Sequence, residues 1–316
     1  MKNEKIYVAG HNGMVGSAIV RELKAKGFNN LLLRSSGEID LRRQKDVEEF
    51  LLSEKPDVVI VAAAKVGGIL ANNTYRAEFL YDNLMIQSNV IHSSYLAGVS
   101  KLIFLGSSCI YPKLAPQPLK EEYLLSDYLE YTNEPYAIAK IAGIKMCENY
   151  FKQYGTNFYS VMPTNLYGIN DNFDLKTSHV LPALIRKFHE AKTESKDKVI
   201  LWGTGKPLRE FLYVDDLAEA VVFLMEKINA GDIYNKNITH LNIGTGKDIS
   251  ISDLALLISD IIGFKGKIEY DTTKPDGTPR KLMDVTRINE LGWKYKTELR
   301  QGIEKTYEWY LSSIKN

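Results

Sequence analysis

The sequence has few cysteines, no long apolar run and no excess of charge of either sign, and each shortage excludes a class of protein. Cys109 and Cys147 are its only cysteines, so we expect a reducing, cytoplasmic location and no disulfide framework. The longest apolar run, residues 58–64, is far shorter than the roughly 20 residues that cross a membrane. Lys and Arg number 40 against 39 Asp and Glu, which argues against a surface that coats nucleic acid or anionic membranes.

What is present is an alternation of short β-branched runs with longer segments of helical periodicity. The 316 residues are 45% apolar and 25% charged, as in globular proteins of about one to three domains. We expect strands at residues 5–9, 31–34, 58–62, 102–105 and 158–162, and helices at 14–26, 45–53 and 77–96. Because residues 58–61 are apolar at every position, the sheet should be covered on both faces. The alternation predicts an α/β fold with a Rossmann-type, doubly wound parallel sheet.

Beyond about residue 168 the pattern becomes looser and indicates a second, smaller domain. Helices are expected at residues 180–191 and 215–227, and one more strand of the sheet at 241–243. The chain should therefore return to the first domain before it ends in the second. We predict a Rossmann domain of residues 1–168 plus about 211–245, and an α+β substrate-binding domain of about 169–210 and 246–316.

A glycine-rich segment, Gly10-His-Asn-Gly13-Met-Val-Gly16, follows the first expected strand and opens the first expected helix. Glycines in this context let the backbone approach a pyrophosphate, which the N–H groups and dipole of the helix N-terminus attract. A turn closed by glycines for packing alone is the alternative.

The end of the second expected strand bears on which dinucleotide is bound. NAD enzymes usually place a carboxylate there against the ribose 2′-hydroxyl, whereas this chain has Arg34, Ser35 and Ser36. A guanidinium suits a 2′-phosphate, so NADP is favoured over NAD, although Glu38 and Asp40 could still reach a ribose.

Three further residues predict a site that reduces a ketone. Tyr136 and Lys140 are four apart on one helix, which places the phenol and the ammonium on one face. The ammonium is expected to lower the pKa of the Tyr136 phenol toward that of a general acid. Ser107 follows the strand at 102–105, where it can hydrogen-bond a substrate carbonyl at the carboxyl edge of the sheet.

These residues resemble the extended short-chain dehydrogenase/reductases, and the resemblance runs along almost the whole chain. The glycine segment and the Tyr-Lys pair are general to that family. More specific matches are Ala62-Ala-Ala-Lys-Val-Gly-Gly-Ile69, Asn72-Asn-Thr-Tyr75, Gly106-Ser-Ser-Cys-Ile-Tyr-Pro112, Pro163-Thr-Asn-Leu-Tyr-Gly168, Arg209-Glu-Phe-Leu-Tyr-Val-Asp-Asp216 and Pro275-Asp-Gly-Thr-Pro-Arg280. The resemblance implies an enzyme that inverts C3 and C5 of GDP-4-keto-6-deoxy-D-mannose and then reduces its C4 ketone with NADPH.

The same resemblance assigns the proton transfers of the two inversions to Cys109 and His179. A thiol and an imidazole both exchange protons near neutral pH, which fits these roles. Cys147 is expected to be a small buried apolar residue. Of the remaining histidines, His11 should contribute its backbone at most, and His92, His189 and His240 should be helix or surface residues.

The resemblance also implies the residues that bind cofactor and substrate. For NADP they are Gly10, His11, Asn12, Gly13, Met14, Val15, Gly16, Arg34, Leu105, Gly106, Ser107, Ser108, Lys140, Pro163, Thr164, Asn165, Leu166 and His179. For the GDP-sugar they are Lys187, Trp202, Arg209 and Asp276, each of which also has a plain structural interpretation as a solvated charge, core residue or turn residue. Some relatives carry arginines where this chain has Asn12 and Ser36, which leaves Arg34 as the main cation near the 2′-phosphate. A two-fold dimer through the helices at 77–96 and 135–154 is implied as well, and no metal is expected.

Two other functions remain open at this point. A nucleotide-sugar epimerase or dehydratase with tightly held NAD would share Ser107, Tyr136 and Lys140, although Cys109 and the lack of an acid at position 34 argue against it. A dinucleotide-sensing regulatory protein would be expected to have lost part of that set, and all three residues are present.

Overall fold

A computed structural model describes residues 2–274 and 276–314, and its centre is a six-stranded sheet in which every pair of neighbours is parallel. The strand order is β2-β1-β3-β4-β5-β9. The bounds are β1 Ile6–Ala9, β2 Leu31–Leu32, β3 Val58–Val61, β4 Lys101–Leu105, β5 Phe158–Pro163 and β9 Leu241–Ile243. The predicted doubly wound parallel sheet is confirmed, including the strand at 241–243.

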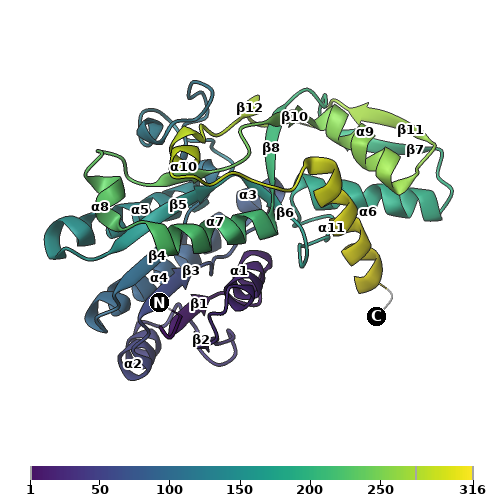
Figure 1. Ribbon diagram of the computed structural model, residues 1–316. Coiled ribbons are helices and arrows are strands. Elements are labelled where there is room, and N and C mark those ends of the chain that lie inside the picture. The colour runs from purple at the N-terminus through teal and green to yellow at the C-terminus, as the bar shows by residue number, and fades with distance from the viewer. Residues whose placement is uncertain (1, 275, 315–316) are drawn as a thin grey trace.

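Helices cover both faces of this sheet (Figure 1). They are α1 Met14–Ala25, α2 Gln44–Glu54, α3 Ile69–Thr74, α4 Arg76–Leu96, α5 Glu134–Tyr154, α7 Val214–Lys227, α8 Ala230–Tyr234 and α10 Thr286–Glu290. Helix α1 packs beside α7, and α4 packs between α2 and α5. The alternation of side chains along a strand accounts for the two layers: Ile6 and Val8 join one buried cluster, and Tyr7 and Ala9 join the other.

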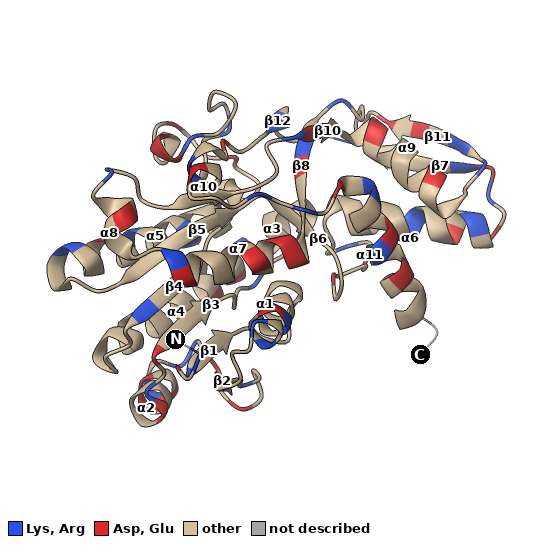
Figure 2. Cartoon of the chain, viewed as in Figure 1, with Lys and Arg blue, Asp and Glu red and all other residues tan. Residues whose placement is uncertain are grey.

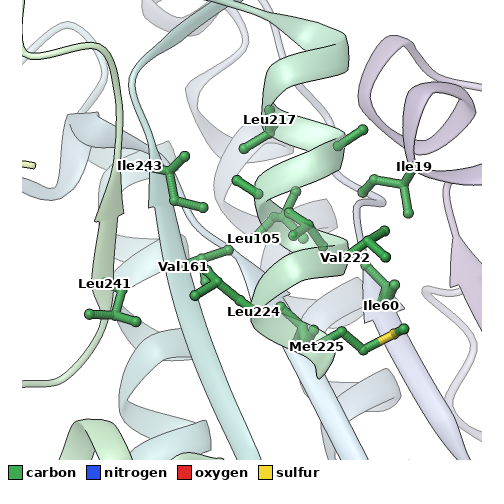
Figure 3. Packing of buried hydrophobic residues seen from close by; sticks show 14 of the residues in the cluster. Ile19, Ile60, Leu105, Val161, Leu217, Val222, Leu224, Met225, Leu241 and Ile243 are labelled. Carbon is green, nitrogen blue, oxygen red and sulfur yellow. The ribbon is translucent and has the colours of Figure 1, made fainter. Parts of the chain in front are cut away.

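Helix α7 shows how the sheet is covered on one face. On its apolar side, Leu217, Val222, Leu224 and Met225 pack against the strands and α1 (Figure 3). Asp215 and Asp216 lie in the first turn of this helix, where the helix dipole favours a negative charge. The expected helix at 215–227 therefore differs from the observed one by a single residue.

The rest of the chain forms smaller sheets with their own helices at one end of the molecule (Figure 1). These elements are β6 Asn165–Tyr167, α6 Val180–Thr193, β7 Lys198–Trp202, β8 Leu208–Tyr213, β10 Asp248–Ser250, α9 Ile251–Ile262, β11 Lys267–Asp271, β12 Arg280–Lys281 and α11 Leu299–Ser313. A third buried cluster joins α6, α9 and α11 to the β7–β11 pair. The boundaries given above for two domains stay a prediction.

Two expectations at the residue level are wrong. The second strand ends at Leu32 rather than at residue 34, so Arg34 lies in the loop that follows it. His240 is fully buried instead of lying on a helix or at the surface, because its ring nitrogens are paired with Tyr111 Oη at 2.7 Å and Thr239 Oγ1 at 2.8 Å. Burial lowers the pKa of His240 to about 3, whereas His92 and His189 do lie in helices α4 and α6.

Acidic and basic residues are mixed along both parts of the chain (Figure 2). Within residues 2–274 and 276–314, no helix is both long enough and apolar enough to cross a bilayer.

Candidate active site

Three loops with predicted functional residues leave the same edge of the sheet. Strands β1, β4 and β5 are parallel, so the segments after Ala9, Leu105 and Pro163 all begin at their carboxyl ends. This edge is where open α/β sheets bind ligands. The hydrogen bond from Gly106 N to Val161 O, at 2.9 Å, continues the β4–β5 pairing into the second of these loops.

The glycine loop has the backbone geometry that a pyrophosphate needs. Gly10 has φ +85°, and a Cβ atom on it would lie 2.7 Å from the Cα of Ala63. A Cβ atom on Gly16 would lie 2.1 Å from the Gly10 carbonyl oxygen, so neither position tolerates a side chain. Helix α1 starts directly after Gly13 with no side-chain cap, which leaves its N–H groups available to an anion. His11 Nδ1 is buried and has no hydrogen-bond partner among the described residues. These features fit a dinucleotide.

Arg34 is already engaged in this structure. Its guanidinium donates to Glu54 Oε1 at 3.1 Å and to the Leu33 carbonyl at 3.0 Å, and it lies over the Phe50 ring. Glu38 accepts from the backbone N–H and the hydroxyl of Ser35, each at 2.7 Å, which lowers the pKa of Glu38. Arg34 would therefore have to share its charge between Glu54 and a 2′-phosphate.

The predicted Ser107, Tyr136 and Lys140 are brought together at the β4 end. Ser107 begins the 3₁₀ turn η1, Ser108–Ile110, and its hydroxyl accepts from Cys109 N at 3.5 Å. Lys140, which is buried in α5, donates from Nζ to the Leu105 carbonyl at 2.9 Å. The same ammonium lies 5.7 Å from the centre of the Tyr136 ring. One strand and one helix thus supply all three groups.

The pKa of Tyr136 moves in the opposite direction from the one expected. Burial raises the pKa of the Tyr136 phenol, the Cys109 side chain adds to the rise, and only the Ser107 hydroxyl lowers it. Lys140 is itself buried, which lowers the pKa of its ammonium to about 8. The phenol consequently keeps its proton at neutral pH, the form in which it can donate to a developing alkoxide.

Cys109 and His179 come from separate loops. His179 is the N-cap residue of α6, and the segment before it is joined to the loop between β3 and α3 by a hydrogen bond from Gly68 N to Thr177 O at 2.8 Å. Burial raises the pKa of Cys109 and lowers the pKa of His179, so both groups tend toward their neutral forms. In each case Lys281 is the charge with the largest influence, and it lowers both pKa values.

Of the four predicted substrate residues, Lys187 lies on α6, Trp202 on β7 and Arg209 on β8, and Asp276 lies in the loop between β11 and β12. Trp202 is 57% exposed, so the alternative interpretation of this residue as part of the core is wrong. Lys187 Nζ lies 5.5 Å from the centre of the Trp202 ring. Arg209 lies on β8, where burial lowers the pKa of its guanidinium. Asp276 accepts from Thr204 N at 2.6 Å and Thr204 Oγ1 at 2.8 Å, so it also holds a turn. Pro275, which begins the sequence block of Asp276, is outside the described residues.

Two residues that the sequence did not single out belong to this region. Glu210 is fully buried, and its carboxylate accepts from Gly246 N and Met283 N, both at 2.8 Å, and from Thr245 N. Lys281 lies on β12 directly opposite Arg209 of β8, and its positive charge lowers the pKa values of Cys109 and His179. Glu210 lies within the matched block Arg209-Glu-Phe, and Lys281 directly follows the block that ends in Thr278-Pro-Arg280. Their place next to these blocks was the only sign in the sequence that they belong to this region. In the part of the chain that the structure describes, no three His, Cys, Asp or Glu side chains are grouped as metal ligands.

Known proteins resemble this chain along most of its length. The model of the NAD dependent epimerase/dehydratase family matches residues 6–244. GDP-L-fucose synthase 1 of Arabidopsis thaliana is 58% identical over 315 residues, covering 100% of this chain and 95% of the relative. GDP-L-fucose synthase of Escherichia coli K12 is 53% identical over 317 residues, covering 99% and 98%. Among solved structures, MlghC, the GDP-mannoheptose C4 reductase from Campylobacter jejuni with NADP bound, is similar with a TM-score of 0.90 and 47% identity, covering 98% of this chain and 99% of that one.

Proposed function

This chain belongs to the NAD dependent epimerase/dehydratase family and, within it, to the GDP-L-fucose synthases, and from that premise we propose how its residues work. It converts GDP-4-keto-6-deoxy-D-mannose into GDP-L-fucose by inverting C3 and C5 and reducing the C4 ketone with NADPH. The observation that carries the proposal is that one edge of the sheet holds a ketone-reducing set, Ser107, Tyr136 and Lys140, and also the Cys109 thiol two residues beyond Ser107.

In the reduction, we assign the oxygen of the C4 ketone to Ser107 and Tyr136. NADPH, when it is bound at the glycine loop, supplies the hydride for C4. The phenol of Tyr136 donates its proton to the oxygen as the carbonyl becomes an alcohol, and the hydroxyl of Ser107 holds that oxygen in place. Lys140 donates to the Leu105 carbonyl and holds a cation 5.7 Å from the centre of the Tyr136 ring, where it stabilises the phenolate left after the transfer.

The two inversions need an acid and a base on opposite faces of the sugar. A base removes the proton from C3 or C5, the electron pair of the broken C–H bond passes to the C4 oxygen as an enolate, and an acid returns a proton from the other face. We assign these transfers to Cys109 and His179. Their separate loops support this assignment, because the two groups approach the site from different elements.

The GDP part of the substrate is assigned to the smaller sheets. Arg209 and Lys187 offer positive charge to the diphosphate, and the exposed ring of Trp202 offers a stacking surface. Asp276, at the turn that faces Thr204, completes the proposed set.

A second candidate is an enzyme that reduces C4 without inverting C3 or C5. It is favoured by the 47% identity to the C. jejuni C4 reductase over nearly the whole chain. The two functions share the reducing residues and differ in what Cys109 and His179 do.

One experiment separates these functions. The purified protein is incubated in ²H₂O with GDP-4-keto-6-deoxy-D-mannose and NADPH, and the product is analysed by NMR. We expect GDP-L-fucose with deuterium at both C3 and C5. The double variant Cys109→Ser, His179→Gln should still bind NADPH through the glycine loop, to which neither residue belongs. It should lose most of the deuterium exchange, since a hydroxyl and an amide exchange protons poorly at neutral pH. Normal product with full exchange from that variant would remove both residues from the mechanism.

We also propose a cytoplasmic enzyme that acts as a homodimer through α4 and α5. Those helices pack against each other and carry large apolar side chains at the surface, among them Tyr81, Leu96, Ile138 and Tyr154. Such a concentration of exposed apolar residues supports burial against a second copy.

A further inference from the structure

Tyr111 lies in the sequence block that also contains Ser107 and Cys109, and none of the roles above uses it. It is the residue at which the 3₁₀ turn η1 ends, and its side chain is buried. Its hydroxyl oxygen lies 2.6 Å from Asn242 Oδ1 and 2.7 Å from His240 Nε2. These contacts join the turn to the beginning of β9, although the two segments are 129 to 131 residues apart along the chain.

The hydrogen bonds within the turn itself are long. Ile110 N donates to Ser107 O at 3.2 Å, and Cys109 N donates to Ser107 Oγ at 3.5 Å. Tyr111 N donates to Ser108 O at 3.5 Å, whereas such bonds usually measure about 2.9 to 3.0 Å. Ile110 is buried in an apolar cluster, but burial of apolar surface has no preferred direction. The orientation of the turn therefore depends on how its two ends are held.

The two ends are held by neighbouring strands of the first sheet. Before the turn, Gly106 N donates to Val161 O of β5 at 2.9 Å. After it, the Tyr111 hydroxyl reaches the two residues on either side of Leu241. Val161 and Leu241 are opposite each other in the β5–β9 pairing, so both points of attachment lie at the same level of the sheet.

The hydrogen bonds of Asn242 determine the direction of its contact with Tyr111. Its Nδ2 donates to two backbone carbonyls, those of Leu119 at 2.9 Å and Asp284 at 3.2 Å. Its Oδ1 is therefore the atom that faces Tyr111, and a carbonyl oxygen can only accept. The hydroxyl of Tyr111 consequently donates its hydrogen to Asn242.

His240 supplies the other half of the contact. Because the Tyr111 hydroxyl uses its hydrogen on Asn242, His240 Nε2 must carry a hydrogen and donate it to the Tyr111 oxygen. His240 Nδ1 then accepts from Thr239 Oγ1 at 2.8 Å. Burial lowers the pKa of His240 to about 3, so the ring keeps this single hydrogen at neutral pH. Every hydrogen of the group has one acceptor, which fixes the position of the phenol.

Other buried tyrosines of this fold do not have such partners. The hydroxyls of Tyr159 and Tyr234 are buried too, and neither has a hydrogen-bond partner among residues 2–274 and 276–314. The two contacts of Tyr111 are thus a property of its place in the fold and not of tyrosine burial in general.

We propose that Tyr111 is a positioning residue, because its hydroxyl, held between His240 and Asn242, fixes the turn that presents Ser107 and Cys109 to the substrate. Loss of the hydroxyl would leave the turn attached firmly only at Gly106. The consequence for catalysis rests on the proposed function, whereas the fixing of the turn does not.

The fixing of the turn is tested without any substrate. The wild type and Tyr111→Phe are treated with iodoacetamide, and peptide mass spectrometry follows the alkylation of Cys109 and Cys147 separately. Cys147 is fully buried in α5 and reports opening of the whole fold. In Tyr111→Phe the alkylation of Cys109 should become about tenfold faster, the factor for one lost hydrogen bond, and that of Cys147 should not change. Equal changes at both cysteines, or no change at Cys109, would overturn the proposal.

Tyr159→Phe is the matched control, because it removes a buried hydroxyl that has no partner. Its alkylation rates should equal those of the wild type at both cysteines. A rise at Cys109 in this variant as large as that in Tyr111→Phe would show that the effect does not belong to the Tyr111 contacts and would overturn the proposal.

Two variants of His240 test the same contact while Tyr111 stays in place. The amide nitrogen of glutamine reaches the position of Nε2, so His240→Gln keeps a donor for the Tyr111 hydroxyl. The amide nitrogen of asparagine reaches only the position of Nδ1, so His240→Asn loses it. Alkylation of Cys109 should stay near the wild-type rate in His240→Gln and rise in His240→Asn, and equal rates would overturn the proposal. This pair decides the matter if Tyr111→Phe does not bind NADPH and is therefore not folded.

The consequence for catalysis is tested with the GDP-sugar. Because the turn carries both Ser107 and Cys109, Tyr111→Phe should lower kcat for NADPH consumption and for deuterium exchange by the same factor, about ten- to a hundredfold, and leave KM close to that of the wild type. A protein that is less stable but has the wild-type kcat would show that Tyr111 serves stability only. If the wild type consumes NADPH without exchanging deuterium, the proposed inversion fails, and the fall in NADPH consumption still tests the position of Ser107.

Discussion

At the scale of single residues, the protonation state of Tyr136 fits the role proposed for it. Its phenol keeps its proton because burial outweighs the Ser107 hydrogen bond, and the cation of Lys140 is directed at the Leu105 carbonyl as well as at the ring. A protonated donor suits reduction of a ketone, in which the oxygen gains a proton as the carbon gains a hydride.

Tyr136→Phe should therefore abolish reduction and spare the inversions. The variant keeps the ring and loses the proton, so consumption of NADPH should fall by about a hundredfold or more. Exchange of solvent deuterium at C3 and C5 should persist at least in part, because Cys109 and His179 are unchanged. NADPH consumption at the wild-type rate would show that another group protonates the oxygen.

Arg34 gives a second prediction at this scale, for the choice of cofactor. If Arg34 contacts the 2′-phosphate, Arg34→Ala should weaken the binding of NADPH about ten- to a hundredfold more than the binding of NADH. This factor corresponds to the loss of one charge-assisted hydrogen bond. Glu54→Gln removes the carboxylate that pairs with Arg34 in this structure, so it should strengthen the binding of NADPH relative to that of NADH. Dissociation constants from fluorescence titration measure both effects, and equal losses for the two cofactors in Arg34→Ala would assign Arg34 to structure only.

At the scale of elements, short connecting segments hold the site together. Glu210 makes one such connection, since its carboxylate accepts hydrogen bonds from the loop after β9 and from the segment after β12. The loop from residue 168 to His179 is another, because Asn170 Nδ2 donates to the Asn12 carbonyl of the glycine loop at 2.8 Å. Asp171 in this loop is largely enclosed, and its Oδ2 has no hydrogen-bond partner among the described residues.

The loop should make stability depend on pH through Asp171. Burial raises the pKa of Asp171 to about 7 in the folded protein, above its ordinary value of 3.8. A raised carboxyl pKa stabilises the fold while the group is protonated, so this contribution is complete below about pH 4 and is lost as the pH rises through about 7. Relative to Asp171→Asn, the wild type should lose about 1 to 4 kcal/mol of unfolding free energy between those limits. Urea unfolding of both proteins across the range measures this, and parallel curves would contradict it.

At the scale of the whole molecule, the residues proposed for the site come from both parts of the chain. The segments after strands of the first sheet contain the glycine loop, Ser107 and Cys109, and the smaller sheets and their helices contain Lys187 and Arg209. In the view of Figure 2, Lys and Arg are interspersed with Asp and Glu along the described chain, and we expect recognition of the substrate to depend on local cations.

The proposed dimer gives a prediction at this scale. Tyr81 on α4 is 59% exposed, and Tyr81→Glu would place a charge in the proposed interface. The variant should elute as a monomer in size-exclusion chromatography with light scattering, and its NADPH affinity should stay close to that of the wild type. Leu256→Glu is the control, since Leu256 is 58% exposed on α9, away from α4 and α5, and should leave the dimer intact. A wild-type monomer, or a Tyr81→Glu dimer, would exclude this interface.

By itself the sequence determined the parallel α/β fold and most of its strands and helices along the chain, and it identified the candidate residues of the reducing site. Helical and strand periodicity, glycine at Gly10 and Gly16, and the spacing of Tyr136 and Lys140 are local properties, so they could be read along the chain. The expected bounds of α1, α4 and α7 are accordingly within one residue of those observed.

Only the tertiary structure decided which distant groups act on one another. Lys281 is more than a hundred residues from Cys109 and His179 along the chain, and no periodicity connects them. The pKa of Tyr136 and the burial of His240 also depend on surroundings supplied by other elements. The physical reason is that desolvation and charge interactions act through space: a pattern along the chain identifies the group, and the packing around it sets its charge.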